Sequence, residues 1–202
     1  MAIDAVIFDF GGVLMDWSPD YLYRKLIPDP TERERFLTEI CSPDWNLEQD
    51  RGRSWDDAIA ERIGLYPDHA LLIRAFRERW IDMLAGPIEP AVNLVARLHQ
   101  AGIALYGLTN WSEETYEIGR PHMPFLPHLR DVAVSGIERV AKPDPRIFHL
   151  LLDRNGLTAT NTAFVDDNEP NIHAATAIGL NAIHHRDTAD TEARLRRLGL
   201  AF

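Results

Sequence analysis

Apolar residues along this chain of 202 residues are grouped in short runs that alternate with helical patterns. The short runs are rich in β-branched and aromatic residues and end in turn residues, so they predict buried strands. Five such runs occur, at residues 6–8, 103–108, 131–135, 162–165 and 181–184. Helices are predicted between them, at residues 91–100, 146–154 and 170–178. This alternation predicts right-handed crossovers and a parallel sheet covered on both faces, that is, an α/β fold with a Rossmann-like three-layer α/β/α core.

The segment from about residue 21 to residue 86 keeps a helical pattern and carries no strand signal. Thr31 begins a helix with a capping-box signature, and Ser54 begins another helix that stops at Gly64. Asp68 opens a third helix, which has an apolar stripe along one side. The pattern therefore predicts a helical unit inserted between the first strand and the rest of the chain.

Proline and glycine mark both ends of this helical unit, at Ser18-Pro19 and at Gly86-Pro87. Within it, the turn from Asn46 to Arg53, which contains a glycine, is expected near the cleft between the two parts of the chain. The two predicted domains are a core of residues 1–16 and 88–202 and a helical cap of residues 17–87.

Composition and charge narrow the class of partner. The formal net charge is −10, whereas a surface that binds nucleic acid needs an excess of Lys and Arg, so nucleic acid is not expected as a partner. A small phosphorylated substrate remains compatible, because it needs only a local positive site. No apolar run is long enough to span a bilayer, so no membrane partner is expected. Cys41 is the single cysteine, which excludes an intrachain disulfide and fits a cytoplasmic location.

Polar residues end several of the predicted strands. Asp9, Thr109 and the pair Asp166-Asp167 follow three strands directly, and Lys142 opens a helix shortly after another strand. Because the carboxyl ends of parallel strands lie at one edge of a sheet, these side chains are expected to converge on a single cleft. Three carboxylates crowded together repel one another unless cations join them. Lys142 supplies one positive charge, and Mg²⁺ is the natural choice for the remainder.

Four motifs, taken in order, resemble the haloacid dehalogenase-like (HAD) hydrolase superfamily, in the branch with a helical cap inserted after the first motif. The resemblance covers essentially the whole chain. It is closest to members that act as phosphatases on small phosphate esters, including sugar phosphatases and the N-terminal domains of some epoxide hydrolases. The motifs are Phe8-Asp9-Phe10-Gly11-Gly12-Val13-Leu14, Leu108-Thr109-Asn110, Ala141-Lys142-Pro143-Asp144-Pro145 and Phe164-Val165-Asp166-Asp167-Asn168.

The resemblance implies a catalytic role for each polar motif residue. Asp9 would attack phosphorus and form an aspartyl-phosphate, which divides the reaction into two steps. Thr109, Asn110 and the Gly12 turn would hold the phosphate. Lys142 would bind substrate as well, neutralise developing charge and keep Asp9 ionised.

The resemblance also implies a Mg²⁺ site. Asp9, the carbonyl oxygen of Gly11 and the acidic pair would provide the ligands. By motif position Asp167 would bind the metal directly, with Asp166 outside it. Asn171 would either orient this acidic loop or lie on a helix face without a role in the site.

Gly11 is a departure from the family pattern, because most phosphatases of this superfamily carry an aspartate there as general acid and base. Some sugar-phosphatase relatives also carry glycine, so the change does not by itself mean inactivity. General acid help is typically worth about 10²–10⁴-fold in rate. Without it, substrates with better leaving groups gain an advantage, and we therefore hypothesise a preference for sugar 1-phosphates.

Two other functions remain open from the sequence. A 2-haloacid dehalogenase on the same scaffold would attack carbon through Asp9 without a metal. A non-catalytic phosphate-binding or regulatory protein would keep the charged residues but release no product. Asp16 could assist catalysis, although an Asp ahead of Ser-Pro-Asp is more typical of capping or turn chemistry. The histidines have no spacing with cysteine that predicts a zinc site.

Overall fold

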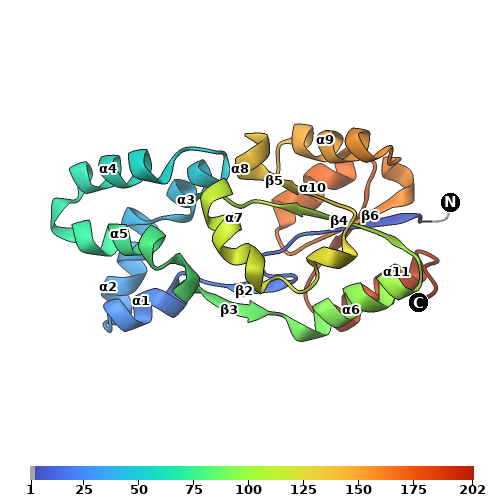
Figure 1. Cartoon of the computed structure of the whole chain (residues 1–202), viewed down its shortest axis with the longest axis horizontal. Helices are drawn as coiled ribbons and strands as arrows, with labels where there is room; N and C mark the ends of the chain where they lie inside the picture. Colours follow the sequence, from blue (N-terminus) through green and yellow to red (C-terminus); the bar gives the residue numbers. More distant parts are fainter. Residues whose placement is uncertain (1–2) are drawn as a thin grey trace.

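A five-stranded parallel sheet forms the centre of the computed structural model, which describes residues 3–202 (Figure 1). The strand order is β5-β4-β1-β6-β7, so β1 lies in the middle. In register, Ala5 of β1 pairs with Ala104 on one side and Thr162 on the other. The five predicted strands are confirmed, with small shifts at their ends. Their bounds are β1 Ala5–Phe8, β4 Ala104–Thr109, β5 Asp131–Val134, β6 Thr162–Asp166 and β7 Asn181–His184.

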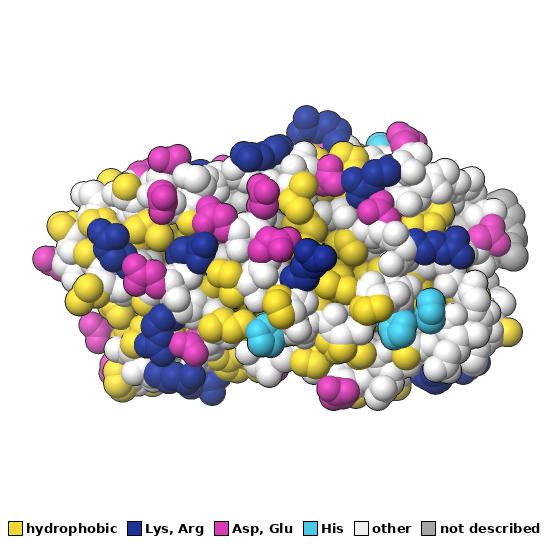
Figure 2. Space-filling view, in the orientation of Figure 1, with side chains coloured by type: hydrophobic (Ala, Val, Ile, Leu, Met, Phe, Trp, Pro, Cys, Tyr) yellow, Lys and Arg dark blue, Asp and Glu magenta, His cyan; other side chains and the backbone are white. Residues whose placement is uncertain are grey.

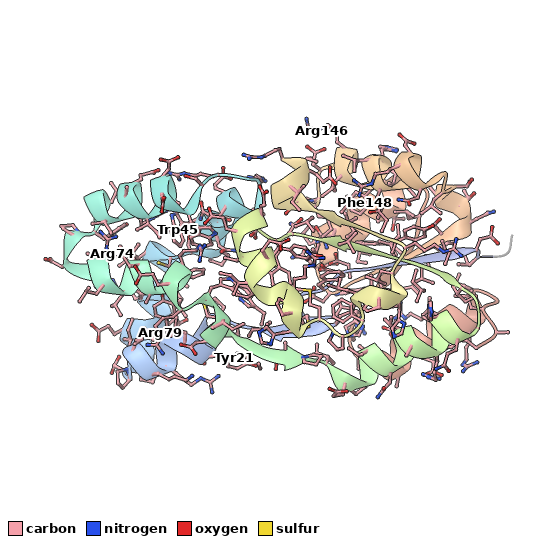
Figure 3. The ribbon with its side chains drawn as sticks, in the orientation of Figure 1. Tyr21, Trp45, Arg74, Arg79, Arg146 and Phe148 are labelled. Atoms are coloured by element: carbon pink, nitrogen blue, oxygen red, sulfur yellow. The ribbon has the colours of Figure 1, made fainter. Side chains whose placement is uncertain are left out.

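Helices cover both faces of this sheet, as the α/β pattern predicts. Val6 and Phe8 of β1 face one apolar cluster, and Ala5 and Ile7 face the other, because successive side chains of a strand alternate. On the first face lie α6 (Glu89–Gln100) and α11 (Thr188–Arg197), and on the second lie α9 (Pro145–Asn155) and α10 (Glu169–Ala177). Figure 3 shows Phe148 between α9 and the sheet. The core therefore has three layers.

The helical insertion forms a separate lobe beside the sheet, on the left in Figure 1. Its interior is aromatic: the ring centroid of Trp45 lies 5.5 Å from that of Trp55 and 5.3 Å from that of Phe76. Large aromatic rings give this small lobe an apolar core of its own. Its helices are α1 Asp20–Leu26, α2 Pro30–Arg35, a π-helix Phe36–Ile40, α3 Pro43–Asp50, α4 Trp55–Leu65 and α5 Ala70–Glu78, with 3₁₀ turns at Pro67–His69 and Trp80–Met83.

Two short strands join the cap to the core, where the sequence predicts turns and helix. β2 (Met15–Trp17) runs antiparallel to β3 (Leu84–Pro87). The prediction of a strandless block up to residue 86 is therefore wrong at its end. Strands of three or four residues are too short to show a period, and their pairing partner is distant in the chain. The domain boundaries at residues 16 and 87 stay a prediction.

Several predicted helix ends also differ from the structure. Helix α2 begins after Asp29, whose side chain accepts a hydrogen bond from the Glu32 amide, and not at Thr31. Helix α4 begins after Ser54, as predicted, but continues past Gly64 to Leu65. Single-residue signals place a helix without fixing its last turn.

The predicted turn from Asn46 to Arg53 is mostly helix. Ser42 caps α3 by accepting a hydrogen bond from the Trp45 amide at 3.2 Å, and α3 continues to Asp50. A tight turn with Gly52 at φ 95° follows. The remaining elements are α7 Glu113–Gly119, α8 Ser135–Glu138 and 3₁₀ turns at Arg120–His122, Leu126–His128 and Ala159–Asn161.

The cap contacts the core at the beginning of α7 and next to α8. Trp55 Nε1 donates a hydrogen bond to the Ser112 hydroxyl at 2.9 Å, and both residues are buried. Arg77 of the cap pairs with Glu114 of α7 at 3.1 Å. The Arg139 guanidinium, next to α8, donates to the carbonyl oxygen of Gly52. These contacts hold the cap against the carboxyl edge of the sheet.

Candidate active site

Lys142 joins two carboxylates at the carboxyl edge of the sheet. Its Nζ lies 2.8 Å from Asp9 Oδ1 and 2.7 Å from Asp166 Oδ2, and it also donates to the Leu108 carbonyl at 2.9 Å. The Lys142 side chain is 1% exposed and that of Asp166 is fully buried. Strands β1 and β6 are neighbours in the sheet, which is why residues 157 positions apart share one cation.

The backbone around Lys142 is fixed by Asn110. The Asn110 side-chain amide donates to the Lys142 carbonyl at 2.9 Å and accepts from the Lys142 amide at 2.8 Å. Asn110 follows β4, so the second and third motifs are bound to each other directly. Thr109 is buried at the end of the same strand. Lys142 itself lies two residues ahead of Asp144, the N-cap of α9, and so does not belong to the helix.

Asp166 and Asp167 have different surroundings, although they are adjacent in the sequence. Asn171 Nδ2 donates to both Asp166 carboxylate oxygens, at 3.1 and 3.0 Å, and the Asn168 amide donates to Oδ1 at 2.8 Å. Together with Lys142, these donors saturate the Asp166 carboxylate. Asp167 is exposed and borders the Gly12 turn. Of the two readings left open for Asn171, the structure shows the one in which it orients the acidic loop.

Gly12 is required where the turn passes the acidic pair. Its φ is +70°, a conformation that glycine adopts at no steric cost, and a Cβ there would overlap the Asp167 carboxylate. Gly11 has an ordinary φ, and a Cβ built on it meets no atom within 4 Å. The two glycines therefore differ: position 12 needs glycine, whereas position 11 has room for a side chain.

Asp9, Asp166 and Asp167 each offer a carboxylate oxygen, and these oxygens lie within 4.8 Å of one another. Within residues 3–202, no other group of three His, Cys, Asp or Glu residues has this arrangement. Hard oxygen donors of this kind fit Mg²⁺ rather than zinc, which prefers nitrogen and sulfur. The residues present therefore fit the metal that the sequence predicts.

Burial dominates the electrostatics of this cluster. It raises the pKa of Asp9 well above its usual range, with Lys142 opposing the shift and Asp166 adding to it. Burial alone would lower the pKa of Lys142, but the two carboxylates beside it raise it above its ordinary value. Burial and the neighbouring Asp166 also raise the pKa of Asp167. A further positive charge at this point would relieve the remaining repulsion between the carboxylates.

A cavity of ≈ 580 Å³ separates the cap from this cluster. Lys142 and Asn110 lie on its core side. Its cap side is mainly apolar, and Asp20, Asp44 and Asp50 are the charged residues there. The apolar lining includes Trp17, Pro19, Leu37, Cys41, Pro43, Leu47, Phe76, Pro143 and Pro170.

A narrow pocket of ≈ 70 Å³ shares four residues with this cavity, namely Trp17, Asn46, Asp50 and Asn110. Its other lining residues are Gly11, Trp80, Trp111 and Thr115. Trp80 lies between two further indoles, with ring centroids 5.2 Å from Trp111 and 6.5 Å from Trp17. The narrow pocket thus extends the cavity toward the turn after the nucleophile candidate.

Asp50 lies at the junction of the two spaces. Asn46 Nδ2, one turn earlier on α3, donates to Asp50 Oδ2 at 3.0 Å. Burial raises the pKa of Asp50 to about 7, and the backbone amide of Ser112 opposes the shift. The sequence places the segment 46–53 near the cleft but does not single out Asp50. Asp44 and Glu48 are acidic residues of the same helix, and nothing in the sequence distinguishes Asp50 from them.

The polar residues predicted from the sequence meet at this edge of the sheet. Asp9, Lys142, Asp166 and Asn110 are joined by hydrogen bonds or ion pairs, and Thr109, Gly11, Gly12 and Asp167 adjoin them. Asp16 does not join this group. It accepts a hydrogen bond from the Tyr21 hydroxyl at 2.8 Å and lines neither space. The individual roles assigned to these residues stay predictions.

The distribution of basic side chains on the surface bears on the expectation, drawn from the net charge, that nucleic acid is not a partner. Figure 2 shows basic side chains interspersed with acidic ones over the visible face, rather than collected into one basic stripe. Arg146, which points outward from α9 in Figure 3, pairs with Asp144 at 2.7 Å. In the part of the chain that the structure describes, every helix is too short or too polar to cross a membrane.

Comparison with known proteins gives a consistent result. A sesquiterpene phosphatase of Aspergillus oryzae, astK, is 28% identical over 203 residues, which cover 96% of this chain and 95% of that protein. A HAD family enzyme of Bacteroides thetaiotaomicron, solved with magnesium and inorganic phosphate, superimposes with a TM-score of 0.69 at 19% identity and covers 90% of this chain and 93% of that one. The L-2-haloacid dehalogenase of Xanthobacter autotrophicus superimposes with a TM-score of 0.62 at 19% sequence identity. The match covers 89% of this chain and 76% of that one.

The sequence family gives the most direct assignment. The model of the haloacid dehalogenase-like hydrolases matches residues 3–179, which include the first motif, the cap and all the polar residues of the site. The resemblance drawn from the four motifs is therefore confirmed. The chain belongs to the haloacid dehalogenase-like hydrolase family.

Proposed function

We propose that the protein is a Mg²⁺-dependent phosphatase that hydrolyses a small phosphorylated metabolite through an aspartyl-phosphate on Asp9. The observation that carries this proposal is the cluster in which Lys142 joins Asp9 to Asp166 while Asp167 remains exposed beside them. Phosphatase activity is also the named function of the Aspergillus relative, and the Bacteroides enzyme with the same fold was solved with magnesium and phosphate.

The geometry prepares one oxygen of Asp9 for attack. Both the Phe10 amide, at 2.7 Å, and Lys142 Nζ, at 2.8 Å, bind Oδ1, which leaves Oδ2 without either partner. These two donors orient the carboxylate, and Lys142 opposes the rise in the Asp9 pKa that burial causes. Oδ2 then forms a bond to phosphorus as the ester oxygen leaves.

Asp9, Asp167 and the Gly11 carbonyl would hold Mg²⁺, with Asp166 fixed behind them by Lys142 and Asn171. The metal supplies charge stabilisation for the phosphoryl group and offsets the repulsion among the carboxylates. Thr109 and the backbone beside Asn110 would hold phosphate oxygens at the end of β4. This division follows the hydrogen bonds, which occupy Asp166 completely and leave Asp167 open.

The cavity favours a substrate whose alcohol part is uncharged and largely apolar. Its cap side offers several apolar side chains and three acidic ones, and Lys142 is the one cationic residue among those that line it. A second anionic group on the substrate would find no cation there to bind it. The sugar 1-phosphates predicted from Gly11 have an alcohol part that is uncharged but polar. Phosphates of apolar alcohols have an alcohol part that is both uncharged and apolar.

Two alternatives make different predictions about the site. A dehalogenase does not need the exposed Asp167 beside the nucleophile, and the dehalogenases of known structure share the fold at 19–20% identity without deciding the chemistry. A non-catalytic protein does not need the attacking oxygen of Asp9 to be free. The cytoplasmic location predicted from the sequence stays a prediction.

The test is the release of inorganic phosphate from a panel of esters, with Mg²⁺ and with a chelator. The panel contains an aryl phosphate, an acyl phosphate, a sugar 1-phosphate, a sugar 6-phosphate and a prenyl monophosphate. We expect Mg²⁺-dependent release that Asp9→Asn abolishes and Asp16→Asn leaves intact, because Asp16 lines neither space. Halide release from a 2-haloacid in the chelator, without phosphate release, would instead establish the dehalogenase.

A further inference from the structure

Breaking a phosphate ester of an ordinary alcohol calls for a proton donor on the side of the leaving oxygen. The attacking and leaving oxygens lie roughly in line through phosphorus. Asp9 attacks from the core, so the leaving oxygen points toward the cap. The donor must therefore be a group of the cap wall, or of the turn at Gly11, and glycine has no proton to give.

The carboxyl groups around the cleft, together with Lys142, can be taken in turn. Asp9 is the nucleophile in the proposed function, and Asp166 and Lys142 are bound to each other. Asp20 is paired with Arg24 and Arg33, at 3.2 and 2.7 Å. Each of these carboxylates therefore already has a cation as its partner.

The remaining carboxyl groups are Asp167, Asp44 and Asp50. Asp167 lies with Asp9 and Asp166 in the carboxylate cluster on the core side, where the proposed function assigns it to Mg²⁺. Asp44 is exposed in the first turn of α3 and does not line the narrow pocket. Asp50 is the last residue of the same helix, where the carbonyl ends disfavour a negative charge. Among the residues that line the narrow pocket, it is the one titratable group.

Asp50 also has the surroundings of a carboxyl group that keeps its proton. Three indoles and the neutral side chains of Asn46, Asn110 and Thr115 make up most of the pocket around it. No Lys, Arg or His within residues 3–202 forms an ion pair with Asp50. Burial therefore raises its pKa to about 7, so that a large fraction is protonated at neutral pH.

The space beside Gly11 leads to the same residue. A Cβ on Gly11 meets no atom within 4 Å, and Gly11 lines the narrow pocket together with Asp50. A side chain at position 11 and the side chain of Asp50 would thus approach one pocket from opposite walls, the first from the core and the second from the cap.

We propose that Asp50 is a catalytic residue, the general acid and base of this phosphatase, supplied by the cap in place of a side chain at position 11. In the first step, the Asp9 Oδ2–phosphorus bond forms, the bond from phosphorus to the ester oxygen breaks, and the Asp50 carboxyl gives its proton to that oxygen. In the second step, water forms a bond to phosphorus, the aspartyl bond breaks, and the Asp50 carboxylate takes the proton of the water. The inference rests on the proposed function.

The experiment compares two esters in wild type and in Asp50→Asn. 4-Nitrophenyl phosphate has a leaving group that needs little protonation, whereas an alkyl phosphate from the panel needs a full proton. We expect Asp50→Asn to lower kcat/KM on the alkyl ester by about 10²–10⁴-fold and on the aryl ester by less than about 10-fold. The aryl ester should also give a burst of nitrophenol, because hydrolysis of the aspartyl-phosphate has lost its base.

Glu48→Gln is the matched control, because Glu48 is an exposed carboxylate on the same helix and pairs with Arg51. It should leave both kcat/KM values unchanged. Asp50→Glu keeps the acid and should restore part of the alkyl activity. Gly11→Asp placed in the Asp50→Asn protein should restore it as well, because position 11 has room for a carboxyl group.

A second measurement needs no variant. In the wild-type enzyme, the ratio of the alkyl to the aryl kcat/KM, corrected for ionisation of each ester, should fall as the pH rises through about 7, the range in which Asp50 loses its proton. Equal losses on the two esters in Asp50→Asn, or a ratio that does not change with pH, would overturn the assignment. A wild-type protein that releases no phosphate from any ester overturns the proposed function instead.

Discussion

The core wall of the cleft carries buried carboxyl groups and the cap wall carries a half-buried one, and different neighbours surround them. On the core wall, Asp9 and Asp166 share the ammonium group of Lys142, and backbone amides complete their hydrogen bonds. On the cap wall, Asp50 has the amide group of Asn46 and aromatic neighbours but no cation. The same functional group therefore has a cation and backbone donors around it on one wall, and an amide group and indoles around it on the other. Surroundings that differ in this way can assign different tasks to two carboxyl groups.

This difference explains how a single fold can use carboxyl groups for opposite tasks. An attacking carboxylate needs its charge, and a neighbouring cation preserves that charge in a buried place. A proton donor needs the opposite, and burial without a cation provides it. The experiments below remove or weaken one side of the comparison at a time.

The largest effect is expected from Lys142→Met, which removes the cation from the core wall. Breaking a buried ion pair on one side leaves uncompensated charge, which typically costs about 3–5 kcal/mol of unfolding free energy. Without metal, Asp9 and Asp166 would then repel each other directly, so Mg²⁺ should raise the melting temperature of the variant more than that of wild type. Phosphate release should fall by about 10²-fold or more.

The control for this variant is Lys25→Met, because the chain has two lysines and Lys25 is exposed. It should change neither stability nor activity appreciably. Chemical denaturation and thermal melting, each with Mg²⁺ and with a chelator, measure the effect. If Lys142→Met were as stable as Lys25→Met in the chelator, the ion pairs of the core wall would not contribute as the geometry indicates.

We expect Asp50→Asn to have an effect of intermediate size on the free energy of unfolding. The pKa of Asp50 is about 7 in the folded protein, above its ordinary value of 3.8, so folding favours the protonated form. Stability contributed by this group is complete at low pH and is lost as the pH rises from about 4 to 7. The asparagine variant has no carboxyl group to ionise, so its free energy of unfolding does not fall for this reason as the pH rises. We expect the variant to be more stable than wild type above pH 7, by about 1–2 kcal/mol after allowance for solvent in the cleft.

Melting temperatures of wild type, Asp50→Asn and Glu48→Gln between pH 4 and pH 9 test this prediction. The difference between Asp50→Asn and wild type should be small near pH 4 and should grow through the window. A difference that stays the same at all pH values would show that folding does not raise the pKa of Asp50.

We expect the smallest effect on stability and activity from a substitution at the contact between the cap and α7. Glu114→Ala removes the ion pair with Arg77 and the bond to the Trp55 amide, both at the rim of the cap. Because the pair is half-exposed, stability should fall by less than about 1 kcal/mol. A looser cap should raise KM several-fold while kcat changes little.

The matched variant is Glu117→Ala, one turn further along α7, where the carboxylate pairs with Arg120 of the core at 3.5 Å. Steady-state kinetics on the best ester of the panel compare the two. An equal rise of KM in both variants would mean that contacts between the cap and α7 do not govern closure.

The core wall could be predicted from the sequence almost completely. A run of apolar residues predicts a strand, the alternation with helices predicts parallel strands joined by right-handed crossovers, and the polar residues Asp9, Thr109 and Asp166 then come to one edge of the sheet. Each step uses a pattern a few residues long. The alternation of apolar runs and helices was enough to predict the three layers, and the structure confirms them.

The short ladder of β2 and β3 and the cap wall could not be predicted in this way. β2 pairs with a segment about 70 residues away, and three residues show no period. Asp50 resembles Asp44 and Glu48 in the sequence. It differs from them only after α3 ends beside α7 and the three indoles close around it.

The sequence by itself determined the strands, the helical insertion and the convergence of Asp9, Lys142 and the acidic pair, because local periodicity and the geometry of parallel sheets require no knowledge of long-range packing. Only the tertiary structure decided which of the carboxyl groups at the cleft have a cation beside them and which has none. The charge of a buried carboxyl group depends on whether a cation lies within reach, and at Asp50 that is fixed by the way the cap docks on the core.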